Sequence, residues 1–124
     1  MLRSALSAIA YDLPAPVAEA HCDGPCGVYD PASARVAAEA VLSMTKKLKG
    51  LEAPAAGDAA ALAAYNNTFG RYVAIKEEEA QKTKKELLIL WTDYFKPDHL
   101  ATFPDLPDTL CKAAKLCRAC KVKN

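Results

Sequence analysis

The 124-residue sequence has almost no net charge, because 15 acidic residues offset 16 lysines and arginines and leave a formal charge of +1. No overall field therefore favours nucleic acid or an anionic membrane surface as a partner. Long apolar runs are also absent, since none approaches the roughly 18 to 20 residues that cross a bilayer. These absences exclude a transmembrane protein and predict one soluble globular domain.

Strand signals and internal repeats are almost absent as well, and helical periodicity takes their place. The first helix is expected to start at Asp30 and Pro31, an aspartate cap followed by a proline at the first helical position, and to end at Gly50. Its apolar residues recur at spacings of three and four and predict one buried face: Val36, Ala37, Ala40, Val41, Met44 and Leu48.

A second, longer helix is predicted after the alanine-rich connector 52–60, and Pro97 is expected to stop it. Asp58 can cap this helix, although two asparagines and a glycine favour a start nearer Thr68. Its charged tract, residues 76–86, is expected to be a solvated face. Its apolar stripe is Phe69, Val73, Ala80, Leu87, Leu90 and Tyr94.

A proline-punctuated loop, KPDHLATFPDLPD, is predicted next, and a third helix then continues to near Lys121. The apolar positions that mark this third helix are Leu106, Leu110, Ala113, Cys117 and Cys120. The sequence therefore predicts an all-α protein whose three recognisable helices form an antiparallel up-and-down bundle.

Five cysteines is an odd number, so a complete disulfide framework would leave one thiol over, and a thiol or metal role is favoured. Two of them share the stretch His21-Cys22-Asp23-Gly24-Pro25-Cys26 with one of only two histidines. The Gly-Pro pair predicts a turn that can bring both sulfurs to one ion. The stretch offers three side-chain donors, one fewer than a closed structural zinc site needs, and no second cysteine or histidine pair lies at finger spacing.

Cleavage between Ala20 and His21 would supply the missing donor, because it frees the α-amine of His21. That amine, the deprotonated amide of Cys22 and two thiolates can lie in one plane around a metal, with the His21 imidazole above it. Planar nitrogen and sulfur donors favour nickel(II) or copper(II) over tetrahedral zinc. A small Cys22–Cys26 disulfide is an alternative, and so is a site for zinc or adventitious copper.

The first twenty residues imitate a secretory signal, with Arg3 near the start, a short apolar run and a small-residue triplet at 18–20. An aspartate and two prolines, however, limit the apolar run to about seven residues, the lower limit for such a signal. We therefore expect residues 1–20 to be a maturation leader, residues 21–124 to be the helical domain, and the location to be the cytoplasm.

Two segments, HCDGPCGVYDP at 21–31 and LWTDYFKP at 90–97, resemble conserved parts of the nickel superoxide dismutase family. The second is similar to the end of that family's second helix. The resemblance covers nearly everything from His21 to about Leu116. The first segment matches the pattern H-C-x-x-P-C-G-x-Y of the nickel-binding hook through His21, Cys22, Pro25, Cys26, Gly27 and Tyr29.

The resemblance implies an enzyme that disproportionates superoxide to dioxygen and hydrogen peroxide by cycling one nickel ion per subunit between its II and III states. It implies a hook over 21–29 that a maturation protease frees, with His21, Cys22 and Cys26 as the metal ligands. Tyr29 would then stand near the open face, limiting access to small molecules and ordering water. The resemblance also implies a homohexamer.

By the same match, Asp23, Asp93 and Tyr94 are candidates for fixing the hook through hydrogen bonds, and Lys96 is a candidate for attracting the superoxide anion. Each of these four could equally be an ordinary helix-end residue. Tyr29 could likewise pack the hook against the bundle, a role compatible with the first.

The sequence departs from the family pattern in three ways. The glutamate and arginine that hold the axial imidazole in familiar members fall on Ala37 and Glu79, which leaves other residues such as Glu39 to restrain it. Gly24 replaces a common leucine, so a more flexible turn is expected. The family's fourth helix has no counterpart before Asn124, so we expect a partial or naturally short bundle with exposed apolar faces unless neighbouring subunits cover them.

Two other functions fit the same residues. One is a noncatalytic helical protein that sequesters nickel, copper or zinc in the hook. The other is a small secreted helical domain that carries a Cys22–Cys26 disulfide and acts through contacts with other proteins. Outside the hook, Cys117 and Cys120 are predicted to be buried free thiols, with a redox or second metal site that includes Cys111 as the alternative. His99 is predicted to be a surface or packing residue.

Overall fold

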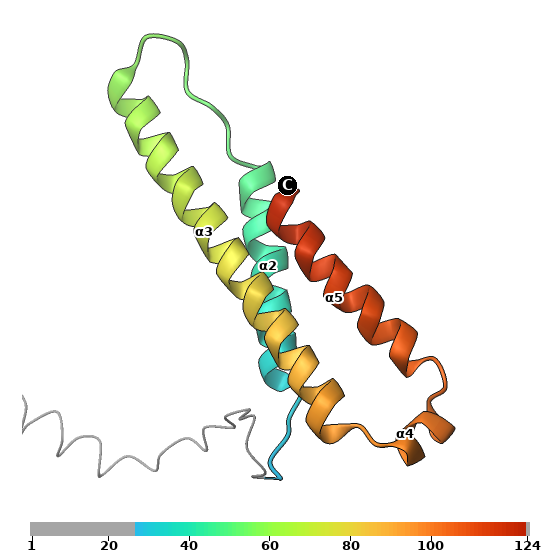
Figure 1. Cartoon of the computed structure of the whole chain (residues 1–124). Coiled ribbons are helices and arrows are strands. Elements are labelled where there is room, and N and C mark those ends of the chain that lie inside the picture. Colours follow the sequence, from blue (N-terminus) through green and yellow to red (C-terminus); the bar gives the residue numbers. More distant parts are fainter. Residues whose placement is uncertain (1–26, 124) are drawn as a thin grey trace, which may run out of the picture.

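Three long antiparallel helices dominate the computed structural model, which describes residues 27–123 (Figure 1). These are α2 (Ala32–Lys49), α3 (Ala59–Ile89) and α5 (Leu106–Val122). A π-helical turn, η1 (Leu90–Tyr94), continues α3, and a short helix, α4 (Pro97–Thr102), precedes α5. No strand occurs between residues 27 and 123. The predicted all-α architecture is confirmed for this part of the chain.

Helix α2 begins and ends almost where the sequence predicted. The Asp30 carboxylate accepts a hydrogen bond from the Ala32 N–H at 2.7 Å and so satisfies one of the free donors of the first turn. Lysines fill the last turn, where the helix dipole favours cations, and Gly50 follows the last residue. Val36 was wrongly assigned to the buried face, since it is 55% exposed. The buried residues are Ala34, Ala37, Val41 and Leu48.

Helix α3 starts at Ala59, so the predicted start nearer Thr68 is wrong. The reason is the cap: the Asp58 side chain accepts a hydrogen bond from the Ala61 N–H at 2.9 Å. One good cap and the alanine-rich first turns that follow outweigh the weak helix propensity of the later asparagines and glycine. With 31 residues, α3 extends well beyond the end of α2 (Figure 1).

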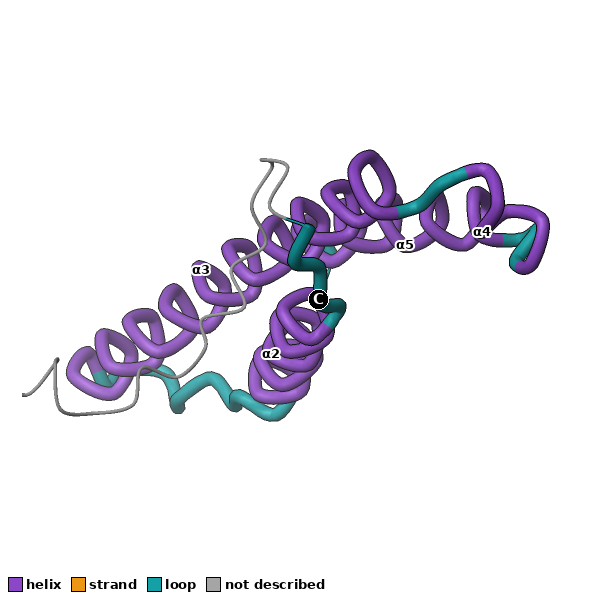
Figure 2. The backbone as a smooth tube through the Cα atoms, turned by 90° about the horizontal axis from the view of Figure 1, so that it is seen from below, coloured by secondary structure: helices purple, strands orange, loops and turns teal. Residues whose placement is uncertain are grey.

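Helix α3 is the central element, because it packs against both α2 and α5. Figure 2 shows α2 beside α3 from below, with the short α4 next to the start of α5. The charged tract 76–86 is not wholly a solvated face, since Lys76, Thr83 and Glu86 are buried in it. The Lys76 ammonium donates a hydrogen bond to the Lys123 carbonyl oxygen at 2.8 Å.

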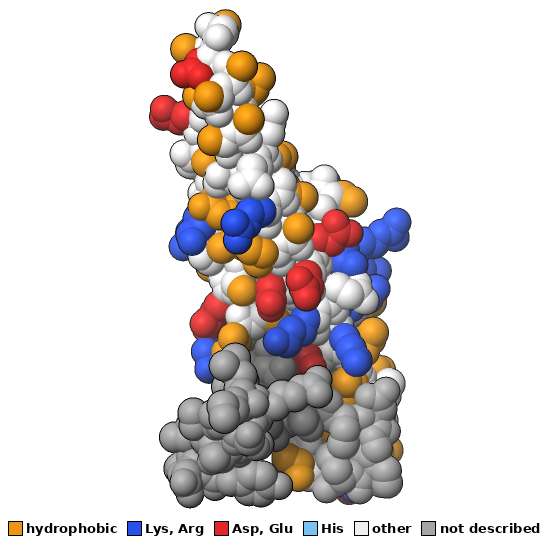
Figure 3. Space-filling model, turned by 90° about the vertical axis from the view of Figure 1, so that its left-hand side faces the viewer, with side chains coloured by type: hydrophobic (Ala, Val, Ile, Leu, Met, Phe, Trp, Pro, Cys, Tyr) orange, Lys and Arg blue, Asp and Glu red, His pale blue; other side chains and the backbone are white. Residues whose placement is uncertain are grey.

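An apolar groove of about 580 Å³ lies between α2 and α5, with α3 as its floor. Leu42 and Leu116 line it and remain 54% and 64% exposed, and this agrees with the expectation of uncovered apolar faces. On the face shown in Figure 3, by contrast, side chains of both charge signs mingle over the middle of the molecule. Among residues 27–123, no helix combines the length and the apolar character needed to cross a membrane.

Candidate functional site

The residues predicted to bind the metal, His21, Cys22 and Cys26, lie outside the described residues, and so does Asp23. Within 27–123, no group of three or more His, Cys, Asp or Glu side chains could hold a metal ion. The described part of the chain begins directly after the last predicted ligand, Cys26. The donor set just before it, one imidazole and two thiolates, suits nickel on chemical grounds.

Gly27 sets the direction of the chain between the predicted hook and the bundle. Its φ of +72° lies in the left-handed region, which glycine adopts without steric cost. A Cβ built on Gly27 would meet no atom within 4 Å, so the demand for glycine comes from the backbone alone. Two residues later the chain places the Tyr29 side chain, half-buried, against the end of α3.

Four aromatic rings form a continuous cluster at this end of the bundle. The Tyr29 and Tyr94 ring centroids lie 5.7 Å apart with the planes inclined by 52°. Tyr94 stacks on His99 at 5.3 Å and 13°, and it meets Phe95 edge-on at 5.2 Å. Phe95 also meets His99 edge-on at 5.8 Å. The distances and tilts are those of favourable aromatic pairs.

The π-helical turn η1 explains how α3 delivers Tyr94 to this cluster. The Phe95 N–H donates to the Leu90 carbonyl oxygen at 3.0 Å, a bond that spans five residues and so takes one more residue into the turn than an α-helix does. The Thr92 hydroxyl donates to the Leu88 carbonyl oxygen at 2.9 Å. The extra residue changes the direction in which the following side chains leave the helix, and single π turns of this kind recur at functional sites.

Helix α4 replaces part of the predicted loop. Pro97 is its first residue and follows two residues with extended backbones, Phe95 and Lys96. Proline is favoured at a first helical position because its fixed φ suits the helix and its missing N–H is not needed there. The Lys96 N–H donates to Nδ1 of His99 at 2.9 Å, and the His99 N–H donates to the Lys96 carbonyl oxygen at 2.9 Å. This reciprocal pair ties the start of α4 to the residue before it.

Of the residues predicted to surround the hook, the structure brings Tyr29 and Tyr94 together. Asp93 and Lys96 flank Tyr94 in sequence and are exposed at the same end of α3. Tyr94 itself is 43% exposed, so the aromatic cluster is open to solvent on one side. Phe95 was not predicted to be in this cluster, whereas the packing role predicted for His99 is confirmed by its half-buried ring against Tyr94. The combination of a proline at the first and a histidine at the third position of α4 was the signal that could have indicated His99.

Ala37 and Glu79 occupy the positions that match the pair expected to hold the axial imidazole, and Glu39 is a further candidate for that role; their environments differ. Ala37 is fully buried and supplies no polar side-chain atom. Glu39 is exposed and forms an ion pair with Arg35 at 2.8 Å, four residues earlier. Glu79 is half-buried on α3. Glu86, which the sequence assigned to a solvated face, is buried at the end of α3 that carries the aromatic cluster.

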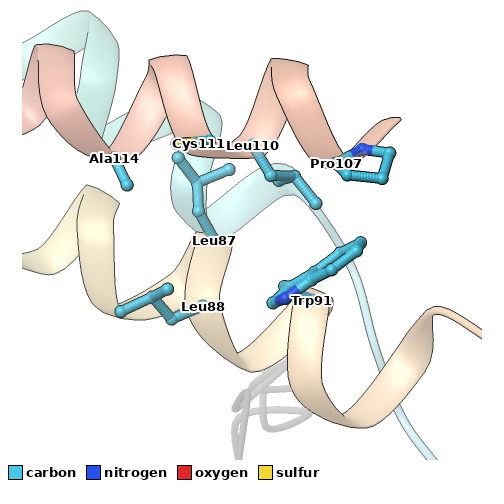
Figure 4. A pocket seen from close by; sticks show the side chains of 7 residues that line it. All are labelled: Leu87, Leu88, Trp91, Pro107, Leu110, Cys111 and Ala114. Carbon is cyan, nitrogen blue, oxygen red and sulfur yellow. The ribbon is translucent and has the colours of Figure 1, made fainter. Parts of the chain in front are cut away.

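The three cysteines of α5 are free thiols. Cys111 borders an apolar cavity of about 290 Å³ between α3 and α5, into which Leu87 and Trp91 also point (Figure 4). Cys117 is buried and Cys120 half-buried, so the predicted burial is confirmed for Cys117 and only partly for Cys120. Burial, followed by the charge of Cys120, raises the pKa of the Cys117 thiol.

The sequence is similar to those of known nickel-containing enzymes. The sequence pattern of the nickel-containing superoxide dismutases matches residues 16–124. The nickel superoxide dismutase of Streptomyces coelicolor is 38% identical over 102 residues, 82% of this chain and 69% of that protein. The enzyme of Streptomyces seoulensis is 40% identical over 105 residues, 85% of this chain and 71% of that protein.

Solved structures agree in fold. A native nickel superoxide dismutase superposes with a TM-score of 0.68 at 37% identity, over 83% of this chain and 78% of that one. An apo form of such an enzyme gives a TM-score of 0.63 at 33% identity, over 77% of this chain and 76% of that one. A match in sequence over most of the chain, joined to a match in helical arrangement, shows that the chain belongs to the nickel-containing superoxide dismutase family.

Proposed function

We propose that this chain holds its nickel in a hook freed by cleavage between Ala20 and His21, with His21, Cys22 and Cys26 as the ligands. As a member of its family, the chain is an oxidoreductase that dismutates superoxide and uses nickel. Residues 1–20 are then the leader that a protease removes, and residues 21–124 are the catalytic domain with one nickel ion per subunit.

One contact carries this assignment: the Tyr29 and Tyr94 rings, 5.7 Å apart. Tyr29 follows Cys26 by three residues, and Tyr94 lies at the end of α3, 65 positions later in the sequence. The contact therefore brings the two family-like segments to one end of the bundle. The contact supports a hook at that end, because three residues of chain reach at most about 10 Å.

The donor set fits nickel for a chemical reason. Two thiolates from Cys22 and Cys26, with the amine, the deprotonated amide and the imidazole of the proposed hook, would supply strong nitrogen and sulfur donors. When bound, nickel supplies the one-electron redox chemistry, since these donors stabilise its higher oxidation state. A chain that still carries Ala20 offers an amide nitrogen in place of the amine, so cleavage completes the donor set.

The chain's own residues then arrange access and protons. Tyr29, against Tyr94, narrows the approach to small molecules and orders water for the two protons that peroxide takes up. Asp23, Asp93 and Tyr94 hold the hook through hydrogen bonds. Lys96 attracts the superoxide anion, and this attraction is local because the net charge of the whole chain is close to zero.

The proposal extends to assembly and location. We propose a homohexamer in the cytoplasm, by resemblance and from the leader's poor match to an export signal. The groove between α2 and α5 supports an assembly, because covering its exposed leucines with another subunit removes apolar surface from water, which is favourable.

Serine substitutions test the ligand assignment. Cys22→Ser and Cys26→Ser should each abolish superoxide removal and reduce bound nickel, because a hydroxyl does not donate as a thiolate does. Cys111→Ser is the matched control, since Cys111 is an exposed free thiol on α5 and is not one of the proposed ligands. The assays are nickel content by elemental analysis and superoxide decay after pulse radiolysis. Full activity in Cys22→Ser or Cys26→Ser would contradict the assignment.

A further inference from the structure

His99 is the least expected member of the aromatic cluster, and it is attached to its surroundings in two independent ways. Its ring stacks on Tyr94 at a centroid distance of 5.3 Å with the planes only 13° apart. Its Nδ1 accepts the Lys96 N–H at 2.9 Å. One side chain therefore touches both a tyrosine and a lysine that stand at the proposed nickel site.

The hydrogen bond also fixes the chemical form of the ring. A backbone N–H can only donate, so Nδ1 must present its lone pair, and the ring proton of the neutral imidazole resides on Nε2. Nothing in α4 itself needs a histidine for this purpose, because a glutamine at the third helical position accepts from the same N–H. The aromatic stack with Tyr94 is what glutamine lacks.

Lys96 depends on this bond for its placement. Its backbone is extended, with φ −124° and ψ 165°, between the π turn that ends at Tyr94 and the first residue of α4. The bond to Nδ1 fixes the peptide unit between Phe95 and Lys96, and so it restrains the Lys96 Cα that carries the exposed side chain. The attraction between a lysine and an anion falls as the distance between them grows, so a fixed Lys96 backbone keeps the ammonium close to one path of approach.

We propose that His99 is a positioning residue of the superoxide site, which holds Tyr94 by stacking and holds Lys96 through Nδ1. This inference rests on the proposed function for its catalytic meaning. The two attachments join only residues of the bundle, Tyr94, Lys96 and His99, so they can be tested separately.

Two substitutions separate the attachments. His99→Phe keeps an aromatic ring against Tyr94 but removes the acceptor, while His99→Gln keeps an acceptor but removes the ring. Phe103→Ala is the control, because Phe103 is exposed just after α4 and lies outside the cluster. The chain that begins at His21 is used with nickel for kinetics, and the 124-residue chain without nickel is used for nuclear magnetic resonance.

In His99→Phe, the Lys96 amide should exchange with solvent at least tenfold faster. The rate constant for superoxide should fall roughly threefold to tenfold, and its dependence on ionic strength should flatten, because a mobile lysine steers less well. In His99→Gln, the Lys96 amide should stay protected and the salt dependence should persist, while the Tyr94 ring resonances shift. Phe103→Ala should match the parent chain in each measurement.

Unchanged Lys96 exchange and unchanged salt dependence in His99→Phe would overturn the proposal, and so would a proton found on Nδ1 from the imidazole ¹⁵N shifts. If the parent chain removes no superoxide, the proposed function fails. Amide exchange and the ¹⁵N shifts, measured without nickel, still decide whether His99 holds Lys96.

Discussion

The five cysteines of this chain divide by environment into two groups. Cys22 and Cys26 belong to the proposed hook, where ligand chemistry requires thiolates. The three cysteines of α5 are free, and they range from exposed Cys111 to buried Cys117. Thiol reactivity depends on access and on the thiolate fraction, so the α5 cysteines should differ from one another in measurable ways.

Cys117 should react with a thiol reagent more slowly than Cys111. Burial limits access to Cys117, and its raised pKa lowers the thiolate fraction at neutral pH. Timed alkylation of the native chain followed by peptide mass spectrometry measures both rates. Equal rates for the two cysteines would show that α5 is not packed as described.

The same shift makes stability depend on pH in a defined direction. The folded-state pKa of Cys117 lies above its ordinary value of 9.0, so the unfolded chain loses this proton first as the pH rises. The free energy of unfolding contributed by the thiol is therefore fully present below pH 9.0 and decreases above it. In urea titrations, the free energy of unfolding should decrease less between neutral and alkaline pH in Cys117→Ala than in the parent chain. Cys111→Ala should show the same decrease as the parent chain.

The left-handed backbone of Gly27 should matter for nickel binding, because Gly27 links the proposed hook to the bundle. Gly27→Ala forces a side chain into a left-handed conformation at a cost of about 1 to 2 kcal/mol. If the chain moves instead, the hook moves with it, and nickel should bind about tenfold more weakly. Gly57→Ala is the matched control, because Gly57 also has a positive φ, +99°, but precedes α3 at the opposite end. Nickel titration should separate the two variants, and equal affinities would contradict a role for Gly27 in the hook.

The helices depend on a narrow core for their packing. Half of the buried residues on α2 are alanines, so its larger apolar side chains, Val41 and Leu48, carry much of the burial. Small residues allow helices to approach closely but bury little area each. A bundle of this composition should be sensitive to the loss of any one of its few large core residues.

Leu48→Ala should therefore destabilise the chain by about 2 to 4 kcal/mol, through lost burial and the cavity left behind. Leu62→Ala makes the same chemical change at a residue that is 49% exposed near the start of α3, and it should change stability by less than about 0.5 kcal/mol. Urea unfolding followed by circular dichroism measures both. Similar effects at the two sites would show that Leu48 is not part of the core.

The elements differ in how far the sequence alone could predict them. Helices α2 and α5 carry clear periodicity and clear end signals, and their predicted bounds agree with the structure within about two residues. The start of α3 was placed too late because propensity was given more weight than the Asp58 cap. Helix α4 and the π turn were missed, since both are too short to give a periodic pattern in the sequence.

At the scale of the whole molecule, the main uncovered apolar surface of the described residues is the groove between α2 and α5. If a second subunit covers it, Leu42→Lys and Leu116→Lys should shift the chain toward monomers, because each places a charge where water is excluded. Val122→Lys is the control, since Val122 is exposed outside the groove. Sedimentation velocity measures the distribution, and an assembly unchanged by both groove variants would show that subunits meet elsewhere.

The proposed metal site could be predicted from the sequence to an unequal degree. The ligand hypothesis comes from six consecutive residues that hold one imidazole and two thiols, and it stays a prediction. The surroundings were less evident, since the contact between Tyr29 and Tyr94 joins segments 65 positions apart. The role of His99 depends on a ring orientation that no local pattern encodes.

The central claim is that cleavage before His21 creates the nickel site. Its most direct test compares two chains, one beginning at His21 and the other keeping Ala20, each loaded with nickel. Rapid superoxide removal and a nickel(III) paramagnetic signal with axial nitrogen coupling are expected only in the chain that begins at His21. Equal activity in the chain that keeps Ala20, or a signal without axial nitrogen, would contradict it.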